Sequence, residues 1–227
     1  LTPTGSEDPF ALRRQTLAVI AILLNKGYGM SLIELINESL KNLKDEKKSA
    51  KTREAVLQFF GQRFEPLFST QGYEFNEIQS ILTFCAEIPL KEIKKRLDAI
   101  REFKKTEGYD EFITAIKRVR NIIPETKLPP FKQELFSAEP EKRLFNDLAK
   151  AELQLKAREL KNYTDNLPDF DYAKTLELLL NLTAPINHFF DNVLVMDKQE
   201  EIKLNRLALL KDIWTLASSI ADFSKLQ

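Results

Sequence analysis

The chain has very little of the two residue types that most often carry metal and nucleophile chemistry. Its 227 residues include one cysteine, Cys85, and one histidine, His188. A single cysteine cannot form an internal disulfide, which is typical of a reducing cytoplasm. One histidine and one cysteine cannot supply a His/Cys zinc site, and nothing around His188 indicates a Ser-His-Asp triad. No Walker loop or GxGxxG motif occurs either. The residues therefore predict binding or scaffolding rather than catalysis.

The chain also lacks an excess of charge of either sign and lacks long apolar runs. Lys and Arg number 34, as do Asp and Glu, so the formal net charge is zero. This balance argues against a bulk electrostatic nucleic-acid binder, although a local basic face remains compatible with it. The longest apolar run, LAVIAILL at 17–24, is too short to span a membrane and lacks the flanks of a signal peptide. We expect a soluble cytoplasmic protein without a membrane partner. Because the chain begins without Met, we interpret it as a fragment of a longer one.

Glycine is scarce, with six residues, and neither hairpin signals nor sustained apolar/polar alternation are present. These features predict an all-α fold. Asp8 and Pro9 are suited to begin a first helix, and Gly27 is suited to end it. Ser31 and Glu34 have the spacing of a capping box. Further helices are expected at about 52–71, 75–87, 90–105, 110–123, 140–161, 172–182, shortly after Pro185, and at 198–223, with a charged connection at 44–51 and a loop at 162–170.

A stretch with three prolines divides the helical pattern. Residues 124–138 contain Pro124, Pro129 and Pro130, and they are interpreted as a linker or as an ordered crossing. The division predicted from it is an N-terminal helical region at 1–123, a proline-rich linker at 124–137 and a C-terminal helical bundle at 138–227.

The helix at 110–123 offers a candidate phosphate-binding face. Phe112, Ile116, Val119 and Ile123 recur at spacings that place them on one face. The polar residues of the last turns lie opposite or beside that face: Lys117, Arg118, Arg120 and Asn121. The preceding helix carries Lys94, Lys95, Arg96, Arg101, Lys104 and Lys105. Two such helices could bind phosphates, and the alternative is an ordinary solvated surface.

The last helix contains a charge within its apolar stripe. Arg206 lies at the helical angle of Ile202, Leu209 and Ile213. Burying such a charge is costly unless it is paired. One interpretation is a structural arginine paired with a carboxylate such as Asp191 or with a helix C-terminus. The other is a contact that takes a phosphate bidentately or stacks on a base.

The segment NHFFDNVLVM at 187–196 combines aromatic and polar residues. Phe189, Phe190 and Met196 could stack on unpaired bases if they are exposed, and the alternative is that both phenylalanines belong to the core. His188 and Asn192 could hydrogen-bond base edges, or they could be ordinary surface residues.

Several motifs, in order along the chain, resemble one family. PTGSEDPFALRR at 3–14 is similar to the end of the HD-like region of the bacterial glycyl-tRNA synthetase β subunit, and AIKRVRNII at 115–123 resembles a segment further along it. The stretch APINHFFDNVLVMDKQEEIKLNRLALLKDI at 184–213, with IADFSKL at 220–226, resembles its C-terminal anticodon-binding domain, of the helical class shared with arginyl-tRNA synthetase.

The resemblance implies a non-catalytic, tRNA-binding portion of a glycine–tRNA ligase. Glycine, ATP and magnesium would bind on a separate α subunit, so no cofactor is expected in this chain. The HD-like histidines would precede Leu1, so no phosphohydrolase activity is implied. The implied partners are glycine tRNA, the α subunit and the remainder of the β subunit. The implied tRNA contacts are Lys117, Arg118, Arg120, Asn121, His188, Phe190, Asn192, Met196, Asn205 and Arg206. The alternative is a helical protein-interaction scaffold without RNA binding.

Overall fold

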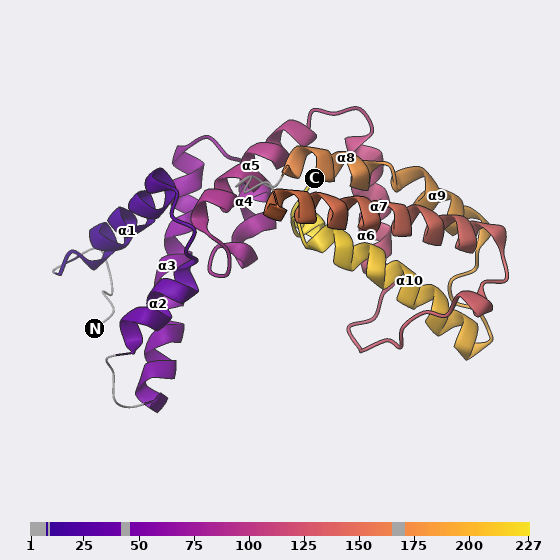
Figure 1. The fold of residues 1–227 in the computed structure, drawn as a ribbon, viewed down its shortest axis with the longest axis horizontal. Helices are drawn as coiled ribbons and strands as arrows, with labels where there is room; N and C mark the ends of the chain where they lie inside the picture. The colour runs from indigo at the N-terminus through magenta and orange to yellow at the C-terminus, as the bar shows by residue number, and fades with distance from the viewer. Residues whose placement is uncertain (1–7, 9, 42–45, 165–170) are drawn as a thin grey trace. The chain divides into compact units, whose positions relative to one another are not determined.

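The computed structural model describes residues 8, 10–41, 46–164 and 171–227, with the side chains of 46–49 and 157–164 outside the description. Within these residues every regular element is a helix, and one isolated antiparallel bridge joins Ser31 to Pro89 (Figure 1). This confirms the predicted all-α fold. None of the helices in the described part is long and apolar enough to span a membrane. The roles predicted for Pro9, for part of the connection at 44–51 and for most of the loop at 162–170 lie outside the described residues.

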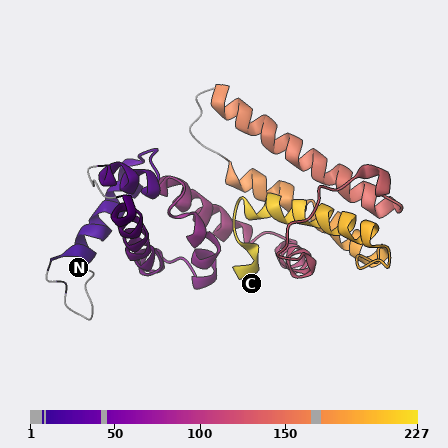
Figure 2. The ribbon, with the colours of Figure 1, turned by 90° about the horizontal axis from the view of Figure 1, so that it is seen from below.

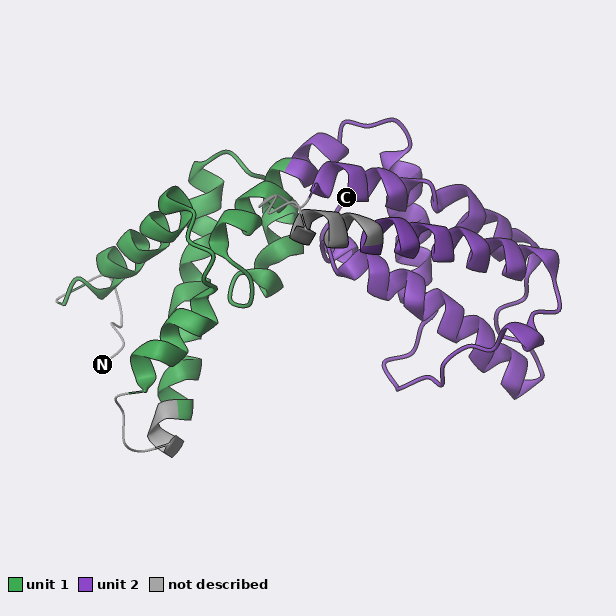
Figure 3. Ribbon diagram, viewed as in Figure 1, with its two compact units in different colours: residues 1–98 green, residues 99–227 purple. Residues whose placement is uncertain are grey.

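The chain divides into two compact units, with the boundary between Asp98 and Ala99, within α5 (Figure 3). The first contains α1 (Leu12–Lys26), α2 (Leu32–Leu40), α3 (Glu46–Thr70), α4 (Phe75–Ile81), the short 3-10 helix η1 (Leu82–Phe84) and the first part of α5 (Leu90–Phe103). The second contains the rest of α5, then α6 (Tyr109–Ile122), η2 (Gln133–Leu135), α7 (Glu139–Thr164), α8 (Tyr172–Leu180), α9 (Thr183–Asn192), α10 (Glu200–Ser218) and η3 (Phe223–Lys225).

The helix ends in the first unit follow local sequence signals. Ser31 caps α2, because its hydroxyl accepts from the Glu34 amide while the Glu34 carboxylate accepts from the Ser31 amide, so the predicted capping box is confirmed. Gly27 ends α1 with φ of 64°, a left-handed conformation that favours glycine. The start of α1 lies later than predicted, at Leu12. Asp8 still accepts from the backbone amides of Arg13 and Arg14 and so satisfies groups at the start of α1.

In the first unit α3 packs against α1, α2 and α4. Phe64 and Phe68 of α3 are fully buried and stack with ring centres 6.1 Å apart, and Tyr73 meets Phe68 edge-on. Cys85 is buried as predicted, and burial raises the pKa of its thiol. The thiol therefore stays protonated at neutral pH and behaves as a small apolar group.

In the second unit α10 packs against α6 and α7, while α9 packs against α6 and α7 (Figure 1, Figure 2). The rings of Phe103, Phe112 and Phe223 form a chain of edge-to-face contacts at the centre of this core. The 123/138 division predicted from the prolines therefore differs from the observed units, because α6 packs within the second one.

The proline-rich stretch is an ordered crossing, one of the two interpretations offered by its sequence. Phe131 and Phe136 form an aromatic cluster with Phe145 of α7. The side chain of Asn205 on α10 also accepts from the Lys132 amide at 2.6 Å and donates to the Lys132 carbonyl at 3.0 Å. Because both backbone groups of Lys132 are bound, the crossing is held against α10 instead of acting as a free linker.

Candidate functional site

The candidate site is a surface formed by the last turns of α6 and α9, which pack together in the second unit. Burial of Phe112, Ile116 and Val119 against the core turns the polar residues of α6 outward. Arg118 and Asn121 are exposed and Lys117 is half-buried. On α9 the same arrangement buries Phe189 and leaves its neighbours outside. We call this surface the α6–α9 face; its members are Lys117, Arg118, Asn121, His188, Phe190, Asp191 and Asn192.

Its centre is a stack between an arginine and a phenylalanine. The guanidinium carbon of Arg118 lies 4.2 Å from the ring centre of Phe190, and one of its nitrogens lies 3.8 Å from the Asp191 carboxylate. Phe190 is half-buried and meets Phe189 edge-on at 5.8 Å. Phe189 therefore belongs to the core, as its alternative interpretation held, while Phe190 is partly accessible. The result is a planar cation that lies over a half-buried aromatic ring.

One helical turn of α9 presents a polar pair. The side-chain amide nitrogen of Asn192 lies 3.1 Å from His188 Nδ1 and donates to the His188 carbonyl at 2.8 Å. Both side chains are exposed. If Nδ1 accepts from the amide, the imidazole carries its proton on Nε2. The pair then offers one donor, Nε2–H, and one acceptor, the Asn192 Oδ1, which suits the edge of an unpaired base.

Arg120 lies apart from this face. It pairs with Glu125, and its guanidinium carbon lies 5.7 Å from the ring centre of Trp214 on α10. The pairing with Arg120 lowers the pKa of Glu125. The structure therefore does not bring Arg120 together with Arg118, although the two are only two residues apart.

Met196 belongs to the loop that follows α9, in which apolar residues alternate between inside and outside. Val193 and Val195 are buried, while Leu194 and Met196 are 70% and 56% exposed. This loop thus presents two apolar side chains beyond the end of α9.

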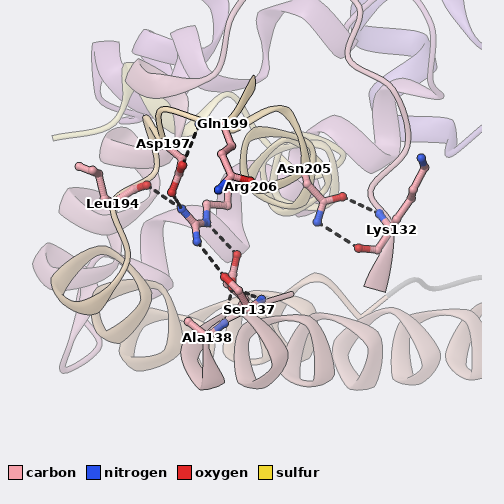
Figure 4. A network of polar contacts seen from close by, with 9 residues as sticks. Lys132, Ser137, Ala138, Leu194, Asp197, Gln199, Asn205 and Arg206 are labelled. Atoms are coloured by element: carbon pink, nitrogen blue, oxygen red, sulfur yellow. Dashed lines mark hydrogen bonds and ion pairs between the residues drawn. The ribbon is translucent and has the colours of Figure 1, made fainter. Parts of the chain in front are cut away.

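Arg206 is buried, at 6% exposure, and anchors that loop (Figure 4). Its Nε donates to Glu141 Oε1 at 2.8 Å, and its other nitrogens donate to Asp197 Oδ2 at 2.7 Å, to the Leu194 carbonyl at 3.0 Å and to Ser137 Oγ at 3.2 Å. The geometry favours the structural alternative for Arg206, with Glu141 and Asp197 as the carboxylates in place of Asp191. Asn205, which holds the crossing, is buried too, and both polar ends of its side chain are bound to Lys132.

Glu141 is the residue that sequence reasoning missed. Its side chain is fully buried, and besides Arg206 it accepts from the backbone amides of Ser137 and Ala138 at 2.8 and 2.7 Å. These amides lie at the N-terminus of α7, where helices leave backbone donors unsatisfied. A glutamate at the third position of a helix is a known capping signal, so the cap was predictable, but its partner 65 residues away was not.

The basic cluster on α5 and the turn after it is partly paired with carboxylates. Lys94 pairs with Asp98, Lys95 with Glu92 and Lys105 with Glu102. Arg96 is buried with its guanidinium over the Phe84 ring. These contacts match the alternative of an ordinary structural and solvated surface. In the described part of the chain no group of three or more His, Cys, Asp or Glu side chains could hold a metal ion.

Residues 113–220, which carry the α6–α9 face, match the family model described as DALR anticodon binding domain, so the second unit is of that helical class. Residues 1–83 match the model described as glycyl-tRNA synthetase beta subunit. The chain belongs to the glycyl-tRNA synthetase β-subunit family, as the motifs indicated.

Curated relatives agree along nearly the whole chain. The glycine–tRNA ligase beta subunit of Thermodesulfovibrio yellowstonii is 43% identical over 99% of this chain and 31% of the relative. Those of Syntrophus aciditrophicus and Rickettsia africae are 36% and 37% identical over 100% and 99% of this chain, and 32% of each relative. The chain therefore spans about a third of the length of these relatives.

Proposed function

We propose that this chain is a non-catalytic, tRNA-binding portion of a glycine–tRNA ligase, and that the α6–α9 face contacts the anticodon region. The match of residues 113–220 to an anticodon binding domain supports the role. The observation that carries the location is the Arg118–Phe190 stack, because a half-buried ring layered with a guanidinium is suited to an unpaired base.

In this mechanism the chain binds the tRNA and positions its anticodon region. Lys117 and Arg118 contact phosphates and set the register of the RNA, while His188 and Asn192 hydrogen-bond the edge of a base splayed out of its stack. The exposed face of the Arg118 plane, or the Phe190 ring once Arg118 turns to a phosphate, accepts the base by stacking. Met196 adds apolar contact beyond the end of α9. Arg206 and Asn205 act through the backbone that they hold.

The chemistry of glycine attachment belongs to the whole ligase. We propose that glycine, ATP and magnesium bind on a separate α subunit, that the rest of the β subunit and this α subunit are the protein partners, and that the enzyme works in the cytoplasm. Ordering the anticodon region here helps to deliver the acceptor end of the tRNA to that subunit.

The test is the affinity of the assembled ligase for glycine tRNA, measured for Arg118→Ala and Phe190→Ala. Loss of one stacking contact is expected to weaken binding by about 10-fold, within the 1–3 kcal/mol typical of a stacked base. Arg143→Ala is the matched control, because Arg143 is an exposed arginine of α7 in the same unit. If all three variants bind equally well, the α6–α9 face is not the contact surface. An altered anticodon should weaken binding of the tRNA to the unmodified protein. The same alteration should change binding to Phe190→Ala only slightly, because that variant has already lost the contact.

A further inference from the structure

A large apolar groove lies in the first unit, within the region of α1, α2 and the turn between them. Its volume is about 990 Å³, and its apolar lining includes Val19, Ile22, Leu23, Tyr28, Met30 and Leu35. Ile20 and Leu23 of α1 are buried inside the unit, while Val19 and Ile22 of the same helix line the groove. Gly27 then ends α1 in a left-handed turn that brings Tyr28 and Met30 to the same groove.

The lining is unusually exposed for side chains of this size. Ile22 is 53%, Tyr28 54% and Met30 42% accessible. Grouped apolar exposure of this kind marks an interaction surface rather than scattered surface residues. The polar members, Glu34, Asn37 and Glu38, come from α2. Glu34 is already engaged with Ser31, and Glu38 pairs with Lys41. With so few polar groups available, the groove fits an apolar protein face better than a small polar ligand.

We propose that this groove is covered by the part of the longer β-subunit polypeptide that lies outside these 227 residues. The three relatives described above each extend well beyond the matched region, which is only 31–32% of their length. The helices that form the groove lie wholly within residues 1–83, the stretch that matches the model of the β subunit itself. The occupant is an apolar face of that polypeptide.

Covalent attachment favours this occupant over a separate chain. A segment on the same polypeptide meets the groove at an effective concentration of about millimolar, whereas a free partner competes at its bulk concentration. The proposal rests on membership of the family and not on tRNA binding, so the two can fail independently.

The two methionines of the chain provide the test, because Met30 lines the groove while Met196 lies in the second unit. Their exposures of 42% and 56% predict similar oxidation by hydroxyl radicals if both are uncovered. In the isolated full-length β subunit, without tRNA or α subunit, we expect Met30 to oxidise about 10-fold more slowly than Met196. Ile22→Glu, which places a charge in the groove, should restore oxidation of Met30. Phe75→Glu is the control, since Phe75 is 65% exposed in the same unit but does not line the groove.

Each other outcome overturns the proposal. Equal oxidation of Met30 and Met196 in the isolated subunit means that the groove is open. Protection of Met30 that arises only when the α subunit is added assigns the groove to that subunit. Protection that grows with the concentration of the β subunit assigns it to a second copy. If Ile22→Glu and Phe75→Glu alter the oxidation rate of Met30 by the same factor, the slow oxidation of Met30 does not come from a segment that covers the groove.

Discussion

A single buried charge, Arg206, organises three segments of the second unit. A guanidinium within an apolar stripe is tolerable only if its donors are satisfied and its charge is balanced. Glu141 on α7 and Asp197 in the loop after α9 balance its charge, and Ser137 in the crossing accepts a further hydrogen bond from it. The same arginine therefore fixes the start of α7 and the loop that presents Met196.

Replacing Arg206 with methionine should destabilise the second unit by about 3–5 kcal/mol, because it leaves the fully buried Glu141 without a counter-charge. Equilibrium unfolding in urea measures the change. Adding Glu141→Gln to Arg206→Met should recover part of the loss, since the buried charge is then removed. The control, Arg143→Met on the exposed surface of α7, should shift stability by no more than about 0.5 kcal/mol. A loss as small as that of the control would mean that the network contributes little.

The loop anchored by Arg206 should also be sensitive to acid. The pKa of Asp197 is lowered by the Gln199 amide that donates to it and by Arg206. A carboxyl group whose folded pKa lies below its unfolded value stabilises the fold above the unfolded pKa, which is about 3.9 for aspartate, and this stabilisation is lost as pH falls through the folded pKa. Asp197→Asn should therefore be less stable than the parent at pH 7, and the difference should shrink once the pH falls below about 4. Urea unfolding across this range measures it, and a difference that does not vary with pH would contradict the assignment.

At the scale of single elements, the capping box of α2 gives a local prediction. Ser31→Ala removes the hydroxyl that accepts from the Glu34 amide and should cost about 1 kcal/mol, seen as a lower thermal midpoint for the first unit. Ser39→Ala in the same helix is the control, because the exposed Ser39 hydroxyl only donates to a carbonyl one turn earlier. Equal effects of both substitutions would mean that the cap does not determine the start of α2.

Elements whose signals are local were predictable, and pairings between distant segments were not. The Ser31–Glu34 box and the Gly27 helix end depend on neighbouring residues, so the sequence alone located them. Arg206 was correctly singled out as a charge in an apolar stripe, but its partners lie 65 and 69 residues away in Glu141 and Ser137. Their identity depends on how α7 and the crossing pack against α10, which no local pattern encodes.

The surface charges of α5 and of the turn after it show pairings that are local. Lys94–Asp98 and Lys105–Glu102 have helical spacings of four and three, so their pairing could have been expected from the sequence. Because these carboxylates neutralise part of the positive charge, the segment is less basic than its number of cations indicates. Arg120 is a second example: it pairs with the nearby Glu125 and lies apart from the α6–α9 face.

On the scale of the whole molecule, a net charge of zero means that RNA binding must come from a local face. If Lys117, Arg118 and one further cation each neutralise a phosphate of single-stranded RNA, this face should contribute about 20-fold to the loss of affinity between 50 and 200 mM salt, from a slope of about −0.7 per phosphate. Binding of glycine tRNA to the assembled ligase, titrated at several salt concentrations, gives the slope. Arg118→Ala should reduce it by about 0.7, whereas Arg143→Ala should leave it unchanged. A protein-interaction scaffold without RNA binding predicts no such loss: salt would leave the affinity for its partner nearly constant, and glycine tRNA would not compete for the α6–α9 face.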